Sequence, residues 1–488
     1  MKRFLAAALL AWLRARGQVL EEEPGRDRTL REPAGAPRTR AQVIAEARDL
    51  FAEMLTVGLS HPSPAHGQRL STLAVSALGA NLPRLSRVLR GLAEESGLLL
   101  RRHVRADEGR LFLDLARAEA LCEALGAGAP APDLVGRHRG HYEPAGALEI
   151  LGAGAFPWRT RSGHGGLTVL FWSPASRGWL TWSESRPAHS AAGFTPAGRY
   201  AGEGPWPGVG SPREASRSRL QLLNARRNGE DRLSSAAGSQ ARTLGPSRLE
   251  EIDFGPRSFT RFADLRRHAA AVHPAGLAER RPGEEIVVVR PALWGPRGFD
   301  PLLQLFRWEL RDGEGERLLL EVPWDDLGRP AIETLESLHP EKDGVWGLIG
   351  RLAPGAPGHV LTPLVLLRQG DPEIVGLGLD PFTGSARRSA DARIAAPPGV
   401  RSPWLERTSR DLGGIEAALE ELAESGRRAF GALPPPLAAG ARDLEALGLP
   451  LLAGALADLP GEAGGFPRRL LRARYLCQLH REAAARMP

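Results

Sequence analysis

The spacing of apolar residues changes twice along this chain, and these changes constrain its fold more than any other feature. Between residues 40 and 126 apolar side chains recur three and four positions apart, the spacing of one buried helix face. The middle of the chain instead contains short apolar runs bounded by Gly, Pro or Asp, which are typical of antiparallel strands. Helical spacing returns after residue 408. The sequence therefore predicts a multidomain α+β protein with N-terminal helices, a central antiparallel β-rich region and C-terminal helices.

A chain of 488 residues is longer than a single hydrophobic core usually supports. Joints rich in Gly, Pro and charged residues supply the expected boundaries, and no internal repeat of fixed period is visible. We expect the following parts: 1–39 as leader and linker, 40–126 as a helical domain, 146–210 as a Trp-rich β unit, 211–281 as a basic irregular linker with a short helix, 283–400 as a β-rich domain and 408–488 as a C-terminal helical region.

The first residues and the cysteines bear on the cellular compartment. The chain opens with basic residues and an apolar run, as an export signal does, but Arg14 and Arg16 stand where a small-residue cleavage site is expected. We interpret residues 1–16 as a short helix or leader, with an export signal as the alternative. Cys122 and Cys477 lie far apart in apolar helical patterns and are expected to be buried and reduced. The prediction is a cytoplasmic protein that crosses no membrane.

Tryptophan is concentrated in one stretch, GLTVLFWSPASRGWLTWSESRP. Trp172, Trp179 and Trp182 fall within eleven residues there, and Trp206 follows in a Gly- and Pro-rich loop. Because strand side chains alternate between two faces, Trp179 and Trp182 must point in opposite directions. One interpretation is that large aromatic rings fill the core of a small β unit. We expect the tryptophans that do not fill this core to form a recognition surface, with at least one exposed tryptophan beside Arg177 and Arg186.

The positive charge of the chain has two interpretations. Only Lys2 and Lys342 are lysines, and the formal net charge is +7. Residues 211–281 contain 14 Arg against 8 Asp and Glu, so the excess is local. A solvated linker explains this segment, and nucleic-acid binding is the less favoured alternative. The residues expected to contact phosphates in that case are Arg226, Arg227, Arg232, Arg266 and Arg267.

Catalytic and cofactor motifs give no lead. The chain has no GxSxG elbow, no GxxxxGK[ST] loop and no GxGxxG fingerprint, so no catalytic residue, metal or cofactor is predicted. Asp325 and Asp326 follow Trp324 and are explained by a turn or a helix start. The function predicted is a noncatalytic binding or scaffold component, and the alternative is a hydrolase-type enzyme whose site is assembled from distant positions.

Four segments between residues 40 and 380 carry a resemblance to a known group of proteins. They are LSHPSPAHGQRLSTLAVSALGANLPRLSRVLRGLAEESG, RTRSGHGGLTVLFWSPASRGWLTWSESRP, GPWPGVGSP and NARRNGEDRLS. They resemble the conserved portion of uncharacterised bacterial proteins that carry a SWIM zinc finger. The resemblance implies a protein partner such as a MoxR-type AAA ATPase or a von Willebrand A protein. Cys122 and Cys477 cannot form the finger's CxC pair, so zinc binding does not carry over.

Overall fold

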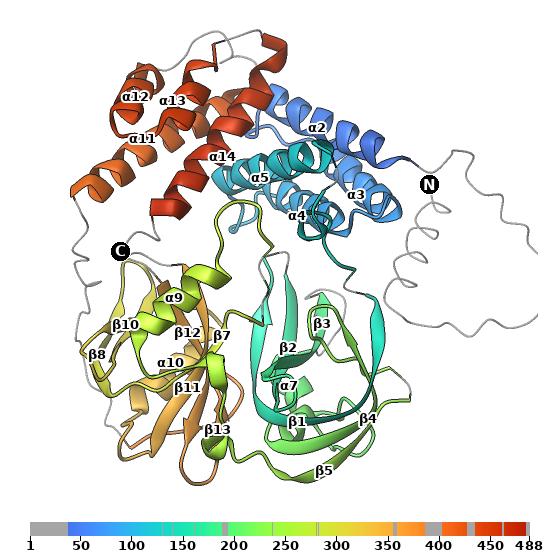
Figure 1. The fold of residues 1–488 in the computed structure, drawn as a ribbon, viewed down its shortest axis with the longest axis vertical. Helices are drawn as coiled ribbons and strands as arrows, with labels where there is room; N and C mark the ends of the chain where they lie inside the picture. The colour runs from blue at the N-terminus through green and yellow to red at the C-terminus, as the bar shows by residue number, and fades with distance from the viewer. Residues whose placement is uncertain are drawn as a thin grey trace, which may run out of the picture. The chain divides into compact units, whose positions relative to one another are not determined.

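The computed structural model confirms the α+β class, with N-terminal helices, central β sheets and C-terminal helices (Figure 1). It describes residues 38–128, 130–138, 140–161, 163–187, 194–236, 238–279, 281, 283–354, 359–385, 403–426, 435–460 and 463–484. The leader at 1–16 and the end of the predicted 283–400 domain therefore lie outside the described residues. The chain divides into two compact units, a β-rich unit and a helical unit, and each is described by itself.

The helical unit is built from both ends of the chain. It comprises Gly35–Arg137, Pro274–Arg280 and Pro398–Pro488. Its N-terminal and C-terminal helices share one hydrophobic core, which also holds Cys122 and Cys477, both buried as predicted. The two predicted helical regions are thus one packed body. Its helices are α2 (Arg40–Val57), α3 (Pro64–Gly79), α4 (Pro83–Leu100), α5 (Glu108–Gly126), α6 (Pro132–Val135), α11 (Pro403–Ser425), α12 (Pro435–Ala446), α13 (Pro450–Ala457) and α14 (Phe466–Ala484).

Local sequence explains where these helices begin. Thr39 accepts a hydrogen bond from the backbone N–H of Gln42, while the Gln42 side chain accepts one from the N–H of Thr39, a capping box at the start of α2. Asp107 is the N-cap of α5, and its side chain accepts a hydrogen bond from the backbone N–H of Arg110. The apolar positions of α2 then face the shared core, as their spacing predicts.

A short segment from the middle of the chain, 274–280, packs into the helical unit. Arg84 of α4 donates hydrogen bonds to the carbonyl oxygens of Leu277 and Asp133. Glu482 of α14 accepts the backbone N–H of Gly276. The Leu277 side chain packs against the shared core. We call residues 274–279 of this segment the strap, because polar and apolar contacts from separate helices hold them.

The first half of the β-rich unit is a small closed barrel. Its sheet has the order β3-β2-β1-β4-β5, all antiparallel: β1 (Tyr142–Arg159), β2 (His164–Ser173), β3 (Gly178–Pro187), β4 (Ser218–Asn228) and β5 (Gln240–Pro246). Two short helices, α7 (Pro196–Ala201) and α8 (Pro212–Ala215), connect β3 to β4. Thr181 of β3 exchanges backbone hydrogen bonds with Asp231 and Leu233 through a parallel bridge. That bridge joins β3, at one end of the sheet order, to the chain between β4 and β5 at the other end, so the sheet curls round a core.

The second half repeats this arrangement. Its sheet order is β6-β7-β11-β12-β10-β9-β8, with β13 also paired to β12. The elements are β6 (Ser258–Phe259), α9 (Phe262–Val272), β7 (Ile286–Val289), β8 (Leu293–Asp300), β9 (Leu305–Arg311), β10 (Arg317–Pro323), α10 (Gly328–Ser337), β11 (Val345–Pro354), β12 (His359–Arg368) and β13 (Ile374–Gly376). Only three residues separate β7 from β8, although these strands lie near opposite ends of the order. The sheet must therefore close on itself.

The two barrels share one connectivity. In each, the first strand pairs with the fourth at its start and with the second at its end, β7 and β8 together taking the place of β1. A helical connection follows the third strand. The third strand also forms a parallel pairing with the segment of chain that comes after the fourth strand. No repeat is visible in the sequence, because the repeated feature is a pairing pattern and not a run of similar residues.

The segment 211–281 is not the irregular linker that the sequence analysis expected. It contains β4 and β5, which complete the first barrel, and β6 and α9, which belong to the second. Leu220, Leu222 and Ala225 of β4 are buried in the first barrel's core, while Arg219, Arg226 and Arg227 of the same strand are exposed. The outward arginines hid a strand pattern. The Trp-rich β unit accordingly extends from residue 142 to 246.

Candidate functional site

The four tryptophans proposed as recognition residues are all buried. Trp172, Trp179, Trp182 and Trp206 are 1%, 4%, 3% and 2% exposed. Trp182 and Trp206 belong to the core of the first barrel, where the indole N–H of Trp206 donates to the carbonyl oxygen of Ser234 at 2.8 Å. The expectation that at least one of the four lies on an exposed face is therefore wrong.

Trp179 and Trp182 point to opposite faces of β3, as predicted. The error concerns what covers the face that carries Trp179. Trp172 and Trp179 lie opposite each other on β2 and β3 and contact Phe254. They face away from the first barrel's core and pack against β7, β11, β12 and β13 of the second barrel. The indole N–H of Trp179 donates to the carbonyl oxygen of Ile286 at 2.8 Å. The second barrel thus buries the surface that would otherwise be a recognition face.

The two arginines proposed to stand beside an exposed tryptophan are exposed but ion-paired. Arg177 lies in the β2–β3 turn at 2.7 Å from Asp253, and Arg186 lies 3.0 Å from Glu184. The arginine that does stack on the cluster is Arg199 of α7, 4.9 Å from the Trp182 ring. This contact is not visible in the sequence, because Arg199 and Trp182 lie on separate elements, α7 and β3.

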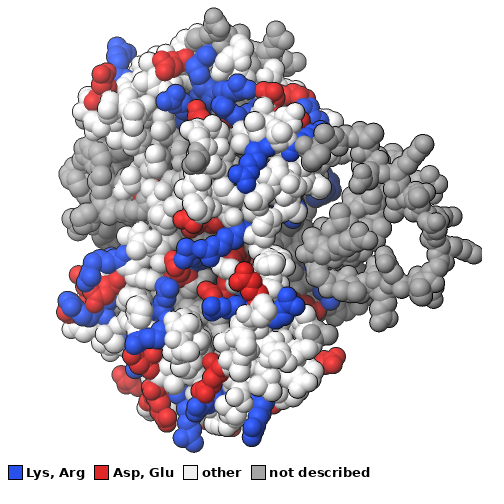
Figure 2. Space-filling model, turned by 45° about the vertical axis from the view of Figure 1, so that its right-hand side comes forward, with Lys and Arg blue, Asp and Glu red and all other residues white. Residues whose placement is uncertain are grey.

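The arginines proposed for phosphate contact are engaged by neighbouring groups. Arg226 donates to the carbonyl oxygen of Tyr142 at 2.8 Å, and Arg227 lies 3.6 Å from Asp231. Arg232 donates to the carbonyl oxygen of Ser183. Arg266 and Arg267 are on α9 of the second barrel and pair with Glu316 and Asp264. In Figure 2 the basic side chains on the face shown lie in small groups among acidic and neutral ones.

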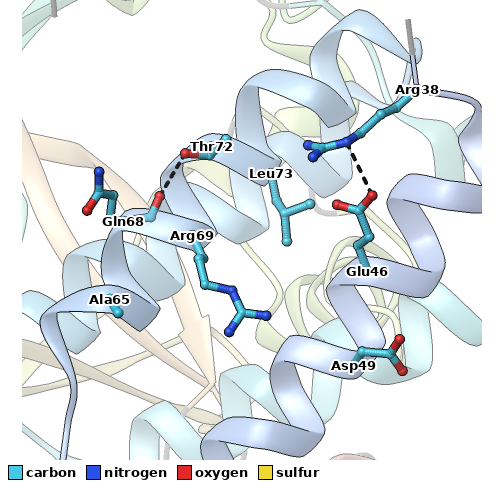
Figure 3. A pocket seen from close by; sticks show the side chains of 8 residues that line it. All are labelled: Arg38, Glu46, Asp49, Ala65, Gln68, Arg69, Thr72 and Leu73. Carbon is cyan, nitrogen blue, oxygen red and sulfur yellow. Dashed lines mark hydrogen bonds and ion pairs between the residues drawn. The ribbon is translucent and has the colours of Figure 1, made fainter. Parts of the chain in front are cut away.

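A pocket of about 430 Å³ lies between α2 and α3 of the helical unit (Figure 3). The Arg38 guanidinium stands 3.2 Å from Glu46, and Arg69 reaches Glu53 at 2.6 Å. Asp49 is 2.7 Å from Arg468. The charged groups therefore neutralise one another around this pocket. It is lined by Arg38, Glu46, Asp49, Ala65, Gln68, Arg69, Thr72 and Leu73.

A buried acid-centred cluster holds the end of the β-rich unit to the first barrel. One oxygen of Asp380 lies 2.8 Å from Arg217 and 3.4 Å from Arg213. The other accepts the N–H of Gly376 at 2.8 Å and the hydroxyl of Tyr200 at 3.2 Å. Burial and the Asp380 charge raise the pKa of Tyr200 to about 12. The phenol therefore stays protonated at neutral pH, and the cluster acts as a structural link.

The second barrel exposes apolar side chains at one end. Leu302 is 93% exposed, Leu303 57% and Trp324 46%. Leu302 and Leu303 lie in the β8–β9 loop, and Trp324 follows β10. The backbone N–H of Trp324 donates to the carbonyl oxygen of Gln304 at 2.9 Å, so the two loops are neighbours. We call residues 301–304 and 323–326 the tip.

The backbone of the tip is held by hydrogen bonds. One oxygen of Asp300 accepts the N–H groups of Leu302 and Leu303 at 3.0 and 3.1 Å, and the other accepts a bond from Arg307. The Gln304 side chain donates to the carbonyl oxygen of Pro301 at 2.8 Å. The leucines are therefore presented to water by a fixed loop.

The second loop of the tip is fixed as well. Asp325 accepts the N–H groups of Leu327 and Gly328 at 3.0 and 2.7 Å, so it stabilises the turn that precedes α10, whereas the N-cap position of α10 is Leu327 and neither acid occupies it. The Trp324 ring contacts Phe299 edge to face, with 5.4 Å between ring centroids. Asp326 lies 3.4 Å from Arg159 and its side chain is 84% exposed. The tip therefore combines apolar side chains with two carboxylates.

No family model matches the chain, and no curated protein matches it. In the part of the chain that the structure describes, no group of three or more His, Cys, Asp and Glu side chains is arranged to hold a metal ion. Among the described helices, none combines the length and the apolar content needed to cross a bilayer.

Proposed function

We propose that the protein is a binding or scaffold component of a bacterial multiprotein system and that the tip of the second barrel is its partner-binding surface. One observation carries this proposal: three large apolar side chains, Leu302, Leu303 and Trp324, are held in water by hydrogen-bonded loops. Large exposed apolar side chains grouped on one rigid surface mark interaction sites, and tryptophan is enriched among the residues that dominate binding energy.

The barrel topology supports the same proposal. Five-stranded barrels of the OB type, which each barrel here resembles in connectivity, bind ligands with the face of strands two and three and with adjacent loops. In the first barrel that face is used to pack against the second barrel. In the second barrel the outward side chains of the same strands form ion pairs, with Arg307 2.9 Å from Glu321 and Arg311 2.7 Å from Glu309. At the loop end of the second barrel, by contrast, Leu302, Leu303 and Trp324 are exposed together.

The test is quantitative affinity purification of the full chain from the cells that naturally produce it. The variant Leu302→Ser/Leu303→Ser removes the apolar side chains, and Leu451→Ser, at a 69% exposed leucine of the helical unit, is the matched control. Burying a leucine side chain contributes about 1.5–3 kcal/mol, so the double substitution should weaken capture at least tenfold. A MoxR-type AAA ATPase and a von Willebrand A protein are the first partners to measure. Equal capture of partners by the unmodified chain, by the double variant and by the Leu451→Ser control would refute the proposal.

A further inference from the structure

We infer that the tip docks into an apolar pocket of a protein partner, and that lysine or arginine side chains border this pocket. The inference rests on the proposed function, because it takes the tip as the binding surface and adds the chemistry of the partner. Three features of the described residues carry it: the protrusion of Leu302, the two carboxylates beside Trp324, and the rigidity of both loops.

The protrusion defines the shape of the partner. Leu302 is 93% exposed, so almost none of its side chain rests on the barrel. A side chain that projects this far is buried only by a concave surface, because a flat surface would leave its flanks in water. Leu303 and Trp324 are exposed by about half and provide the adjoining contact area. The partner therefore supplies a pocket, and the tip supplies the residue that fills it.

The carboxylates define the charge of the partner. Asp325 and Asp326 directly follow Trp324 and are both exposed. One oxygen of Asp325 is already used by the start of α10, and Asp326 has Arg159 at 3.4 Å. Docking of Trp324 would remove water from the second oxygen of Asp325, which those two hydrogen bonds do not use, and from Asp326, whose ion pair with Arg159 is largely exposed. A desolvated carboxylate is tolerated only beside a cation or hydrogen-bond donors. Lysine or arginine at the pocket border meets this need and also speeds association at low salt.

The same carboxylates favour a protein over a membrane. Exposed leucine and tryptophan on loops also suit insertion into a bilayer, but anionic membrane surfaces attract basic segments and repel acidic ones. The tip itself contains two acids and no basic residue. The rigidity of its loops also reduces the entropy lost on docking into a preformed pocket.

The experiment places a photo-crosslinking benzophenone amino acid at Leu303 of the full chain in cells that naturally produce it. The same amino acid at Leu451 is the matched control. We expect Leu303 to yield a crosslinked protein that Leu451 does not, with the crosslink mapped to an apolar pocket bordered by Lys or Arg. With that purified partner, Asp325→Asn/Asp326→Asn should raise Kd about threefold to tenfold at 50 mM salt, with little difference at 500 mM.

The outcomes separate the inference from the proposed function. Two results would overturn the inference alone. In the first, the tip contacts a partner, but the partner's pocket has no basic residues at its border. In the second, the Kd for that partner changes neither with the Asn substitutions nor with salt. Binding of the chain to phosphatidylcholine–phosphatidylglycerol vesicles, abolished by Leu302→Ser/Leu303→Ser, would overturn it in favour of a membrane. Absence of any crosslink specific to Leu303 would contradict the proposed function itself. Asp326→Asn alone, which leaves the α10 start intact, controls for damage to the loop.

Discussion

Replacing Trp179 by alanine should destabilise the β-rich unit strongly, because this side chain joins the two barrels. Its ring is 4% exposed and packs against Trp172 and Phe254, with centroids 5.0 and 5.8 Å away. Truncating a buried tryptophan costs about 3–5 kcal/mol, including the cavity that remains. Its indole N–H also satisfies the carbonyl oxygen of Ile286, a hydrogen bond worth about 1 kcal/mol within that range.

Differential scanning calorimetry of the full chain is the assay, because the two units are expected to unfold as separate transitions. For a unit of this size each kcal/mol shifts Tm by about 2–4 °C, so Trp179→Ala should lower the Tm of the β-rich unit by roughly 6–20 °C. Trp179→Phe keeps most of the packing and should cost roughly half as much or less. Trp324→Ala, at a half-exposed ring, should cost no more than about 1.5 kcal/mol. If Trp179→Ala and Trp324→Ala shift Tm equally, the packing between the barrels is misassigned.

Three further predictions concern other contacts. Asp380→Asn leaves the partly buried Arg217 without its counter-charge and should lower the free energy of unfolding by about 3 kcal/mol, measured by denaturant unfolding. Asp326→Asn, at an exposed ion pair, is the control and should lower it by under about 1 kcal/mol. Equal losses in the two variants would contradict the buried link. Burial raises the pKa of Asp312, but hydrogen bonds from the backbone N–H groups of Phe262, Glu316 and Glu314 outweigh it and lower the pKa overall. The stabilisation should therefore be present at pH 7 and lost as pH falls through the folded-state pKa. Asp312→Asn should destabilise the protein at pH 7 by an amount that shrinks as pH falls below the ordinary Asp pKa, and a cost independent of pH would refute this. Arg84→Met removes the hydrogen bond to the carbonyl oxygen of Leu277 and should expose the strap to limited proteolysis near Leu277. Arg90→Met, on the same helix, is the control and should leave the strap uncut. An uncut strap in both variants would show that Arg84 does not hold the segment.

Local patterns in the sequence were sufficient for the helices and for part of the β structure. The spacing of apolar residues in α2 matches the side chains it buries, and Thr39 marks its start. The alternation of strand side chains also placed Trp179 and Trp182 on opposite faces. These features depend on residues close in sequence, so periodicity and capping rules detect them.

The sequence could not show what covers each face. Whether the outward face of β2 and β3 meets water or another sheet depends on β7, β11 and β12, which begin about a hundred residues further along the chain. β4 was missed for a different reason. Its inward residues Leu220 and Leu222 do alternate, but the arginine count of the segment was given more weight than that alternation.

The tip was missed although a signal was present. Leu302 and Leu303 stand side by side between Pro301 and Gln304, in a turn where polar residues are the norm. Two leucines in such a loop either return to a core or serve a partner, and the sequence alone does not distinguish these outcomes. The exposures of 93% and 57% decide the question.

Hydrogen exchange of the full chain, free and bound to its purified partner, decides whether the tip is the binding surface, because it reports which backbone segments the partner protects. We expect new protection at 301–304 and 323–327, in the tip and just before α10, and no change in β2 and β3 at 164–187. Protection confined to 164–187 would restore the Trp-rich hairpin as the recognition surface and contradict the assignment of the tip.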